Sequence, residues 1–187
     1  VCEHFNIPVQ AGDDEVLARM RRGYTIEEYL ECVDRIRRFV PGAALSTDVI
    51  VGFCGETERQ FQKTLGVLES VRFDKVHVAA YSPRPGTIAW RHMEDDVPQE
   101  EKMRRLHAVE ELQERISREN NAPFVSQTQE VLVEGEESRV FTGRNRVNKL
   151  VHFQAKESPA IGDLVEVRIE KATAWSLQGR LAAAVPA

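Results

Sequence analysis

Two β-branched apolar runs with a capped helix between them constrain the first part of this chain most strongly. The runs are ALSTDVIVGF (44–53) and KVHVAAY (75–81), and their nearly unbroken apolar character is typical of buried parallel strands. Between them, Thr57 and Gln60 have the spacing of a capping box, which predicts a helix over 58–71. Strands that alternate with helices predict a parallel sheet joined by right-handed crossovers.

The residues before these runs continue the alternation. A short strand is expected at 5–10, followed by a helix within 11–23 that has Gly23 as its left-handed C′ residue. Thr25 and Glu28 then form a second capping box, which predicts another helix with one apolar face.

A long charged helix from Pro98 to about Asn121 completes this part, in the order β, α, α, β, α, β, α. Three strands cannot close a parallel barrel, which commonly takes about eight. The first part is therefore expected to be an incomplete α/β layer.

The pattern changes after Pro123, where short strands are separated by glycine or polar turns without any helical period. The expected strands are TQEVLVEGE, SRVFTGRN, KLVHFQA, LVEVRIEKAT and SLQGRLA. Such a series predicts a small antiparallel β-barrel or sandwich. We therefore expect an α/β domain over 1–124 and an all-β domain over 125–187.

Three cysteines, Cys2, Cys32 and Cys54, occur without any CxxC spacing. This argues against a disulfide framework and against a self-contained metal site, and it favours a reduced, cytoplasmic setting. Cys32 lies between the apolar residues Tyr29 and Ile36 of its helix, so we expect a buried, inert thiol. No apolar run approaches the roughly 18–20 residues of a membrane helix, so no membrane partner is expected.

Polar residues and glycines gather at the ends of the three expected strands, in 10–13, 52–57 and 81–87. Carboxyl ends of neighbouring parallel strands meet at one rim, and this set suits a zwitterionic ligand with a ribose. Alternatively, Gly52 and Gly55 serve only the backbone of a tight turn.

Asp48 lies inside an apolar strand, where an ionised side chain is rare without a partner. It either faces the interior of the layer as a site residue or has a structural role. The five histidines are scattered and are expected to be structural or exposed: His4, His77, His92, His107 and His152.

The segment GRNRVNKLVHF (143–153) holds Arg144, Arg146 and Lys149 without an acid, although the net charge of the chain is −5. It is either a solvated hairpin or a surface that grips RNA through phosphates and stacking. Aromatic residues that flank the cations favour the second interpretation, namely Phe141, His152 and Phe153, with Trp175 as another stacking surface or a cap of the barrel.

Several segments, in this order, resemble the radical S-adenosylmethionine methylthiotransferases of the MiaB type. They are IPVQAGDDEVLARMRRGYTIEEYL, LSTDVIVGFCGETE, YSPRPGT and the tail VLVEG…TGRNRVNKLVHF…IGDLVEVRI…SLQGRL, which is similar to the family's TRAM domain. The resemblance implies the C-terminal half of a (β/α)6 partial TIM-type barrel, followed by an OB-like TRAM barrel that binds RNA.

The resemblance also implies S-adenosylmethionine and two 4Fe–4S clusters, with an electron donor for the cluster chemistry. The family's cluster cysteines precede the part that this chain resembles, so we expect an N-terminal half to be missing. This chain alone is then expected to hold no metal and no catalytic residue, and to be inactive.

By the same resemblance, six residues would face the cofactor, and four would contact RNA. The first set is Gln10, Asp48, Gly52, Glu56, Tyr81 and Arg84, and the second is Arg144, Arg146, Asn148 and Lys149. Cys54 stands where the family usually has proline, and Ala11 and Asp13 stand where it usually has serines. We expect no task for the Cys54 thiol, and the two serine positions weaken the case for a hydroxyl contact to the cofactor.

The implied activity is methylthiolation of N6-isopentenyladenosine at adenine C2, next to the anticodon, after hydrogen abstraction by a 5′-deoxyadenosyl radical. The partner would be the anticodon stem-loop of tRNA. Two alternatives remain: the sister enzyme that methylthiolates an aspartate of a ribosomal protein, and a non-catalytic RNA-binding module.

Overall fold

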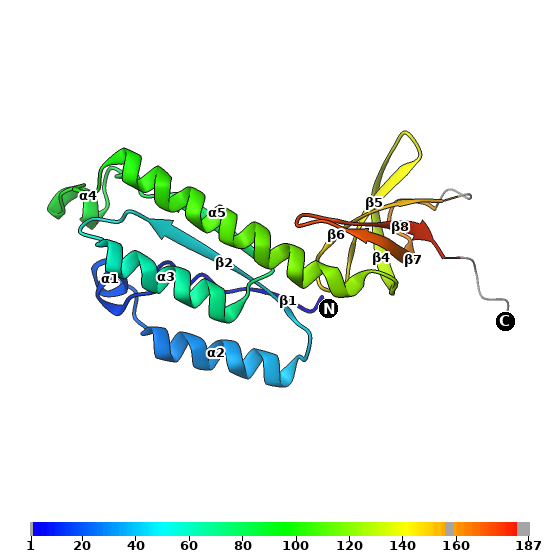
Figure 1. The fold of residues 1–187 in the computed structure, drawn as a ribbon, viewed down its shortest axis with the longest axis horizontal. Coiled ribbons are helices and arrows are strands. Elements are labelled where there is room, and N and C mark those ends of the chain that lie inside the picture. Colours follow the sequence, from blue (N-terminus) through cyan, green and yellow to red (C-terminus); the bar gives the residue numbers. More distant parts are fainter. Residues whose placement is uncertain (1, 156–158, 183–187) are drawn as a thin grey trace. The chain divides into compact units, whose positions relative to one another are not determined.

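The computed structural model describes residues 2–155 and 159–182 of the chain. It divides into two compact units (Figure 1). The α/β unit is Phe5–Gln113, and the barrel unit comprises the residues from Glu114 onward with those before Phe5. In the described part of the chain, no helix is both long and apolar enough to cross a membrane.

The α/β unit contains a three-stranded sheet with the order β1-β2-β3. The elements in chain order are β1 (His4–Asn6), α1 (Asp14–Arg19), α2 (Ile26–Phe39), β2 (Ala44–Val51), α3 (Glu58–Val71), β3 (Lys75–Ala80), α4 (Ile88–His92) and α5 (Gln99–Asn121). Strands β2 and β3 are parallel, and a parallel bridge joins Gln10 to Val49. The predicted alternation and parallel sheet are confirmed, with α4 as an addition.

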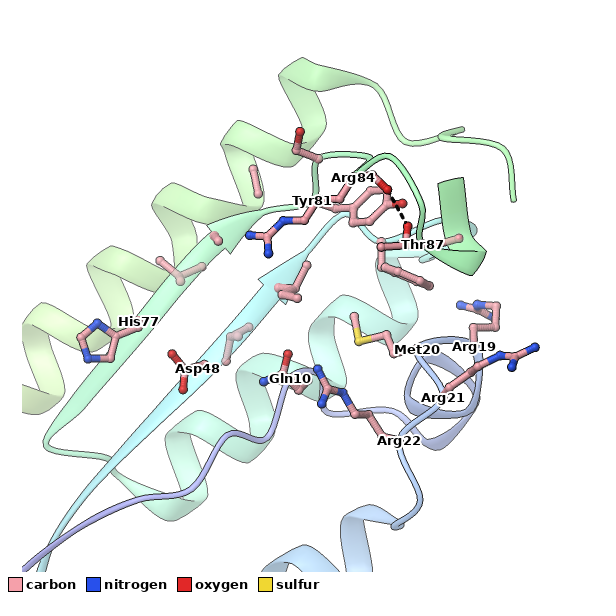
Figure 2. Close-up of a pocket in the computed structure, with 18 of the residues that line it drawn as sticks. Gln10, Arg19, Met20, Arg21, Arg22, Asp48, His77, Tyr81, Arg84 and Thr87 are labelled. Carbon is pink, nitrogen blue, oxygen red and sulfur yellow. Dashed lines mark hydrogen bonds between the residues drawn. The ribbon is translucent and has the colours of Figure 1, made fainter. Parts of the chain in front are cut away.

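One face of this sheet packs against helices. Leu45, Val49 and Val51 of β2 share a buried cluster with residues of α2, α3 and α5. Alternate residues of a strand point to opposite faces, so Asp48 and Ile50 belong to the other face, which holds the pocket described below. Figure 2 shows helices behind the sheet and the side chain of Asp48 in front of it.

Both predicted capping boxes are present. Thr25 accepts from the backbone N–H of Glu28 while Glu28 accepts from that of Thr25, and Thr57 and Gln60 do the same at the start of α3. These exchanges satisfy donors that a helix start leaves unpaired, which fixes where each helix begins after its loop.

The prediction for Gly23 is wrong. Helix α1 ends earlier, with Met20 as its C-cap, and Arg21 holds the left-handed conformation with φ 57°. The backbone N–H of Arg21 donates to Ala18 O at 3.0 Å and that of Arg22 donates to Leu17 O at 2.9 Å. This is the Schellman pattern with arginine in place of glycine.

The prediction for Cys32 is also wrong, because its thiol is exposed. The buried face of α2 is centred on Tyr29 and Val33. At 3.6 residues per turn, Cys32 lies at the edge of that face rather than within it.

The barrel unit contains a closed five-stranded barrel with the order β4-β5-β6-β8-β7. Its elements are η1 (Ala122–Phe124), β4 (Thr128–Glu137), β5 (Val140–Asn145), β6 (Leu150–Gln154), β7 (Leu164–Ala172) and β8 (Leu177–Leu181). The predicted all-β fold is confirmed, but the barrel is not wholly antiparallel. Strands β6 and β8 pair in parallel, because β8 inserts between β6 and β7 to close the barrel.

Candidate functional site

A pocket of about 670 Å³ lies in the α/β unit, on the sheet face that the helices leave open (Figure 2). A volume of this size is in the range of small-molecule and cofactor sites, roughly 300–1,000 Å³. The polar side chains that line it are Gln10, Arg19, Arg21, Arg22, Asp48, His77, Tyr81, Ser82, Arg84 and Thr87. Four of the six residues expected to face a cofactor therefore lie here: Gln10, Asp48, Tyr81 and Arg84.

Asp48 and His77 form the polar floor of the pocket. They are register partners in the parallel pairing of β2 with β3. Asp48 is half-buried, and Asn6 Nδ2 lies 3.4 Å from Asp48 Oδ2. Sequence reasoning missed His77 by treating it as a scattered histidine. The period of two in KVHVAAY was the available signal, since it places His77 and Tyr81 on one face.

Gln10 lines the pocket and has a strained backbone conformation, which hydrogen bonds to β2 maintain. Its φ is 67°, a left-handed value that costs a non-glycine residue roughly 1–2 kcal/mol. Two hydrogen bonds to β2 fix it: Gln10 N donates to Asp48 O and Ile50 N donates to Gln10 O, each at 2.9 Å. The residue is 7% exposed, yet its amide side chain makes no hydrogen bond to any described residue.

Tyr81 directly follows β3 and lines the pocket. Its ring packs edge-on against Phe53, with centroids 4.8 Å apart. Burial, a hydrogen bond with the Cys54 thiol and the charge of Asp95 raise the pKa of Tyr81 to about 12. Its hydroxyl is therefore neutral at physiological pH and can donate a hydrogen bond. The buried Cys54 thiol, for which no task was expected, is thus a neighbour of this hydroxyl.

Gly52 and Glu56 belong to the turn after β2 and are not among the lining residues. Gly52 has φ 70°, and a Cβ there would lie 2.4 Å from Cγ of Lys102. Lys102 is 2% exposed; it pairs with Asp95 and donates to Tyr81 O at 3.3 Å. The close approach that Gly52 permits is therefore made by a side chain of α5.

Glu56 is 4% exposed, and its buried carboxylate stabilises the same turn through hydrogen bonds. Its Oε2 accepts from Gly52 N at 2.6 Å and from Arg105 Nη1 at 2.9 Å, whereas its Oε1 has no partner among the described residues. Burial raises the pKa of Glu56, and the bonds from Gly52 and Arg105 oppose that shift. A contact between Glu56 and a cofactor stays a prediction.

In the barrel unit, Arg144 and Arg146 of the basic segment are paired with acids that the segment itself lacks. Arg146 Nη1 lies 3.0 Å from Glu130, and Arg144 Nε lies 3.5 Å from Glu134. Lys149 Nζ lies 5.7 Å from the ring centroid of Phe124. Their role in RNA binding stays a prediction.

Two of the three aromatic residues expected to stack on RNA beside this segment do not lie at the surface, whereas His152 is half-buried. Phe141 and Phe153 are buried in the barrel core, where their rings stack with centroids 5.5 Å apart. Strand alternation explains this, because the two residues face each other across β5 and β6 on the inner side. Trp175 is 62% exposed and stays available as a stacking surface.

Within residues 2–155 and 159–182, no three His, Cys, Asp or Glu side chains are grouped so that they could hold a metal ion. The described side chains thus offer no ligand set for an iron–sulfur cluster.

The sequence matches the Radical SAM superfamily over residues 1–68 and the TRAM domain over residues 124–182. It is 48% identical over 184 residues to the tRNA-2-methylthio-N(6)-dimethylallyladenosine synthase of Acetivibrio thermocellus. The aligned region covers 97% of this chain and 38% of that protein. The protein of the same name from Dehalococcoides mccartyi is 47% identical over 97% of this chain and 43% of its own length. The one from Thermotoga petrophila is 43% identical over 97% of this chain and 41% of its own length. The chain spans about two fifths of the length of these curated relatives. The chain therefore carries a Radical SAM superfamily match followed by a TRAM domain match, and nearly its whole length is similar to proteins that share the name tRNA-2-methylthio-N(6)-dimethylallyladenosine synthase.

Proposed function

We propose that this chain is part of an enzyme that methylthiolates N6-isopentenyladenosine at adenine C2, next to the anticodon of tRNA. The observation that carries the proposal is the agreement of relatives named for this product along 97% of the chain. The chain's own contribution is the wall of a cofactor pocket and a surface for RNA.

The α/β unit is proposed to be the C-terminal half of the radical S-adenosylmethionine domain, over residues 1–124, and its sheet to be the last three strands of a (β/α)6 partial barrel. The sheet face that carries the pocket, with its polar floor, supports this proposal. Residues 125–187 are proposed to be the TRAM domain that contacts the anticodon stem-loop.

The pocket suits S-adenosylmethionine, because Gln10 presents a nearly buried amide without a partner among the described residues. When bound, this cofactor supplies the radical that removes a hydrogen atom from the substrate. Asp48 would accept from ribose hydroxyls, Arg84 would pair with a carboxylate, and Tyr81 would donate from its neutral hydroxyl. Gly52 and Glu56 would act on the cofactor through the shape of their turn.

The described side chains of this chain do not fit the iron–sulfur clusters of the superfamily, because no three of them are grouped as metal ligands. Ligands for two 4Fe–4S clusters, and the contact with an electron donor, are proposed to belong to the remaining part of the full-length protein.

Complementation of a bacterial strain that lacks the 2-methylthio group on its tRNA tests the function. The full gene that encodes this chain is expected to restore 2-methylthio-N6-isopentenyladenosine, as measured by mass spectrometry of tRNA nucleosides. The same gene with Asp48→Ala is expected to restore much less, while Asp34→Ala on the exposed side of α2 serves as the control. Failure of the unmodified gene, or methylthiolation of a ribosomal-protein aspartate instead, would overturn the proposal.

A further inference from the structure

The connection between α1 and α2 places two arginines at the pocket, and neither guanidinium has a partner among the described residues. Arg21 and Arg22 both line the pocket, and both are exposed. Within the described residues, neither guanidinium makes a hydrogen bond or an ion pair. The neighbouring Arg19 differs, because it donates to Gly55 O and Gln60 Oε1 at 3.2 Å each.

Elsewhere in the same unit, many cations are used internally. Arg105 and Lys102 are buried against Glu56 and Asp95, and Lys63 pairs with Asp13 at 2.5 Å. Two guanidiniums without a partner in the described part of the chain therefore form a local positive patch at the pocket, although the net charge is −5. Such local clustering matters more to a polyanion than the net charge does.

The backbone that carries these arginines is rigid and strained. Arg21 holds the left-handed C′ position of the Schellman pattern, which glycine usually occupies, and Arg22 is fixed by its bond to Leu17 O. A non-glycine residue in this costly conformation indicates that its side chain has a function at this position. Because the turn is already ordered, a ligand would bind without ordering it first.

Figure 2 shows Arg22 reaching toward Gln10, whose amide is nearly buried and has no partner among the described residues. A charged donor is therefore directed toward a polar group at the same pocket, as expected where a charged RNA backbone passes a pocket that receives a base. One carboxylate needs only one guanidinium, and Arg84 already lies on this pocket, whereas successive phosphates of an RNA strand can engage both arginines of the turn.

We infer that Arg21 and Arg22 bind phosphates of the RNA strand that delivers its base to this pocket. The inference rests on the proposed function, and it adds an RNA contact in the α/β unit to the one proposed for the TRAM domain. The two arginines position the strand and do not read its sequence.

Binding of a synthetic anticodon stem-loop that carries N6-isopentenyladenosine tests this, by fluorescence anisotropy over a range of salt concentrations. The variant Arg21→Gln/Arg22→Gln is expected to bind roughly tenfold more weakly at about 0.1 M salt. The slope of log affinity against log salt is expected to fall by about 1.4, since a single-stranded phosphate contact contributes roughly 0.7. The control is Arg35→Gln/Arg38→Gln, which removes two exposed arginines of α2 that do not line the pocket and have no partner in the described structure. It is expected to retain the slope.

A second variant separates binding from folding. Arg21→Gly suits the left-handed turn, so its unfolding midpoint should equal or exceed that of the wild-type chain while its RNA affinity falls.

An unchanged salt slope in the Arg21→Gln/Arg22→Gln variant, or an equal loss in the α2 control, would overturn the inference and leave the proposed function standing. A wild-type chain that binds a scrambled hairpin as well as the anticodon stem-loop would count against the proposed function, while the slope would still decide the phosphate contact. Loss of S-adenosylmethionine binding with unchanged RNA binding would assign the arginines to the cofactor and overturn the inference.

Discussion

The turn after β2 and the basic segment of the barrel both depend on arginine–glutamate pairs, but in opposite surroundings. In the turn, Arg105 and Glu56 are both about 4% exposed and lie 2.9 Å apart. In the barrel, Arg146 and Glu130 are separated by a similar 3.0 Å, but their side chains are 57% and 37% exposed. Similar distances thus describe a buried pair that must stay intact and a solvated pair that can exchange its partner, as RNA binding requires.

The largest effect is expected for Arg105→Met, which leaves the Glu56 carboxylate buried without its charged partner. We expect the free energy of unfolding to fall by about 3–5 kcal/mol, as measured by urea denaturation of the chain. Adding Glu56→Gln should recover part of this loss. A single variant as stable as the wild-type chain would show that the buried pair does not hold the turn.

Gly52→Ala is expected to have the next largest effect, because its Cβ would meet Cγ of Lys102 at 2.4 Å. We expect a loss of about 2–3 kcal/mol in the free energy of unfolding. Gly42→Ala is the matched control, since Gly42 also has a positive φ, 82°, but has open space around its Cβ. If the two variants lose the same stability, backbone strain alone explains the need for glycine at position 52.

Two of the three glutamates near Arg105, Glu101 and Glu56, predict opposite dependences on pH. Hydrogen bonds from Arg104 and Arg105 lower the pKa of Glu101 to about 2, from an ordinary value of 4.5. Its stabilisation is present above pH 4.5 and is lost as the pH falls toward 2. Glu56 has a raised pKa, so its contribution is greatest below 4.5 and declines as the pH rises. In urea denaturation, the difference between wild-type and Glu101→Gln chains should shrink from pH 4.5 to pH 2, and a constant difference would contradict the assignment.

The smallest effect on stability is expected in the barrel. Replacing Arg144, Arg146 and Lys149 together by alanine should change the free energy of unfolding by less than about 1 kcal/mol, since the pairs are exposed. The same variant should bind the anticodon stem-loop more weakly, with a lower salt slope. Unchanged RNA binding would remove this segment from the proposed RNA surface.

Local patterns allowed much of the fold to be predicted. The capping boxes at Thr25 and Thr57, the parallel strands and the barrel strands all follow from short-range periodicity and turn chemistry. The same alternation also predicts that Phe141 and Phe153 are buried. The cations beside them in sequence instead favoured a stacking role at the surface.

Features that depend on distant residues could not be predicted. No local pattern indicates that Lys102 passes beside Gly52, or that Glu130 and Glu134 neutralise the basic segment of the barrel. The end of α1 at Met20 was missed because Gly23 is the stronger signal for a left-handed residue, whereas Arg21 adopts that conformation.

The position of Lys102 and Arg105 on one helix has a consequence for folding order. The two residues of α5 hold the ends of both β2 and β3, and Arg105 is 49 positions from Glu56 in sequence. Contacts between such distant residues form slowly compared with helix ends and turns. During synthesis, the strands and α3 can associate first, but the rim of the pocket takes its final shape only after α5 has left the ribosome.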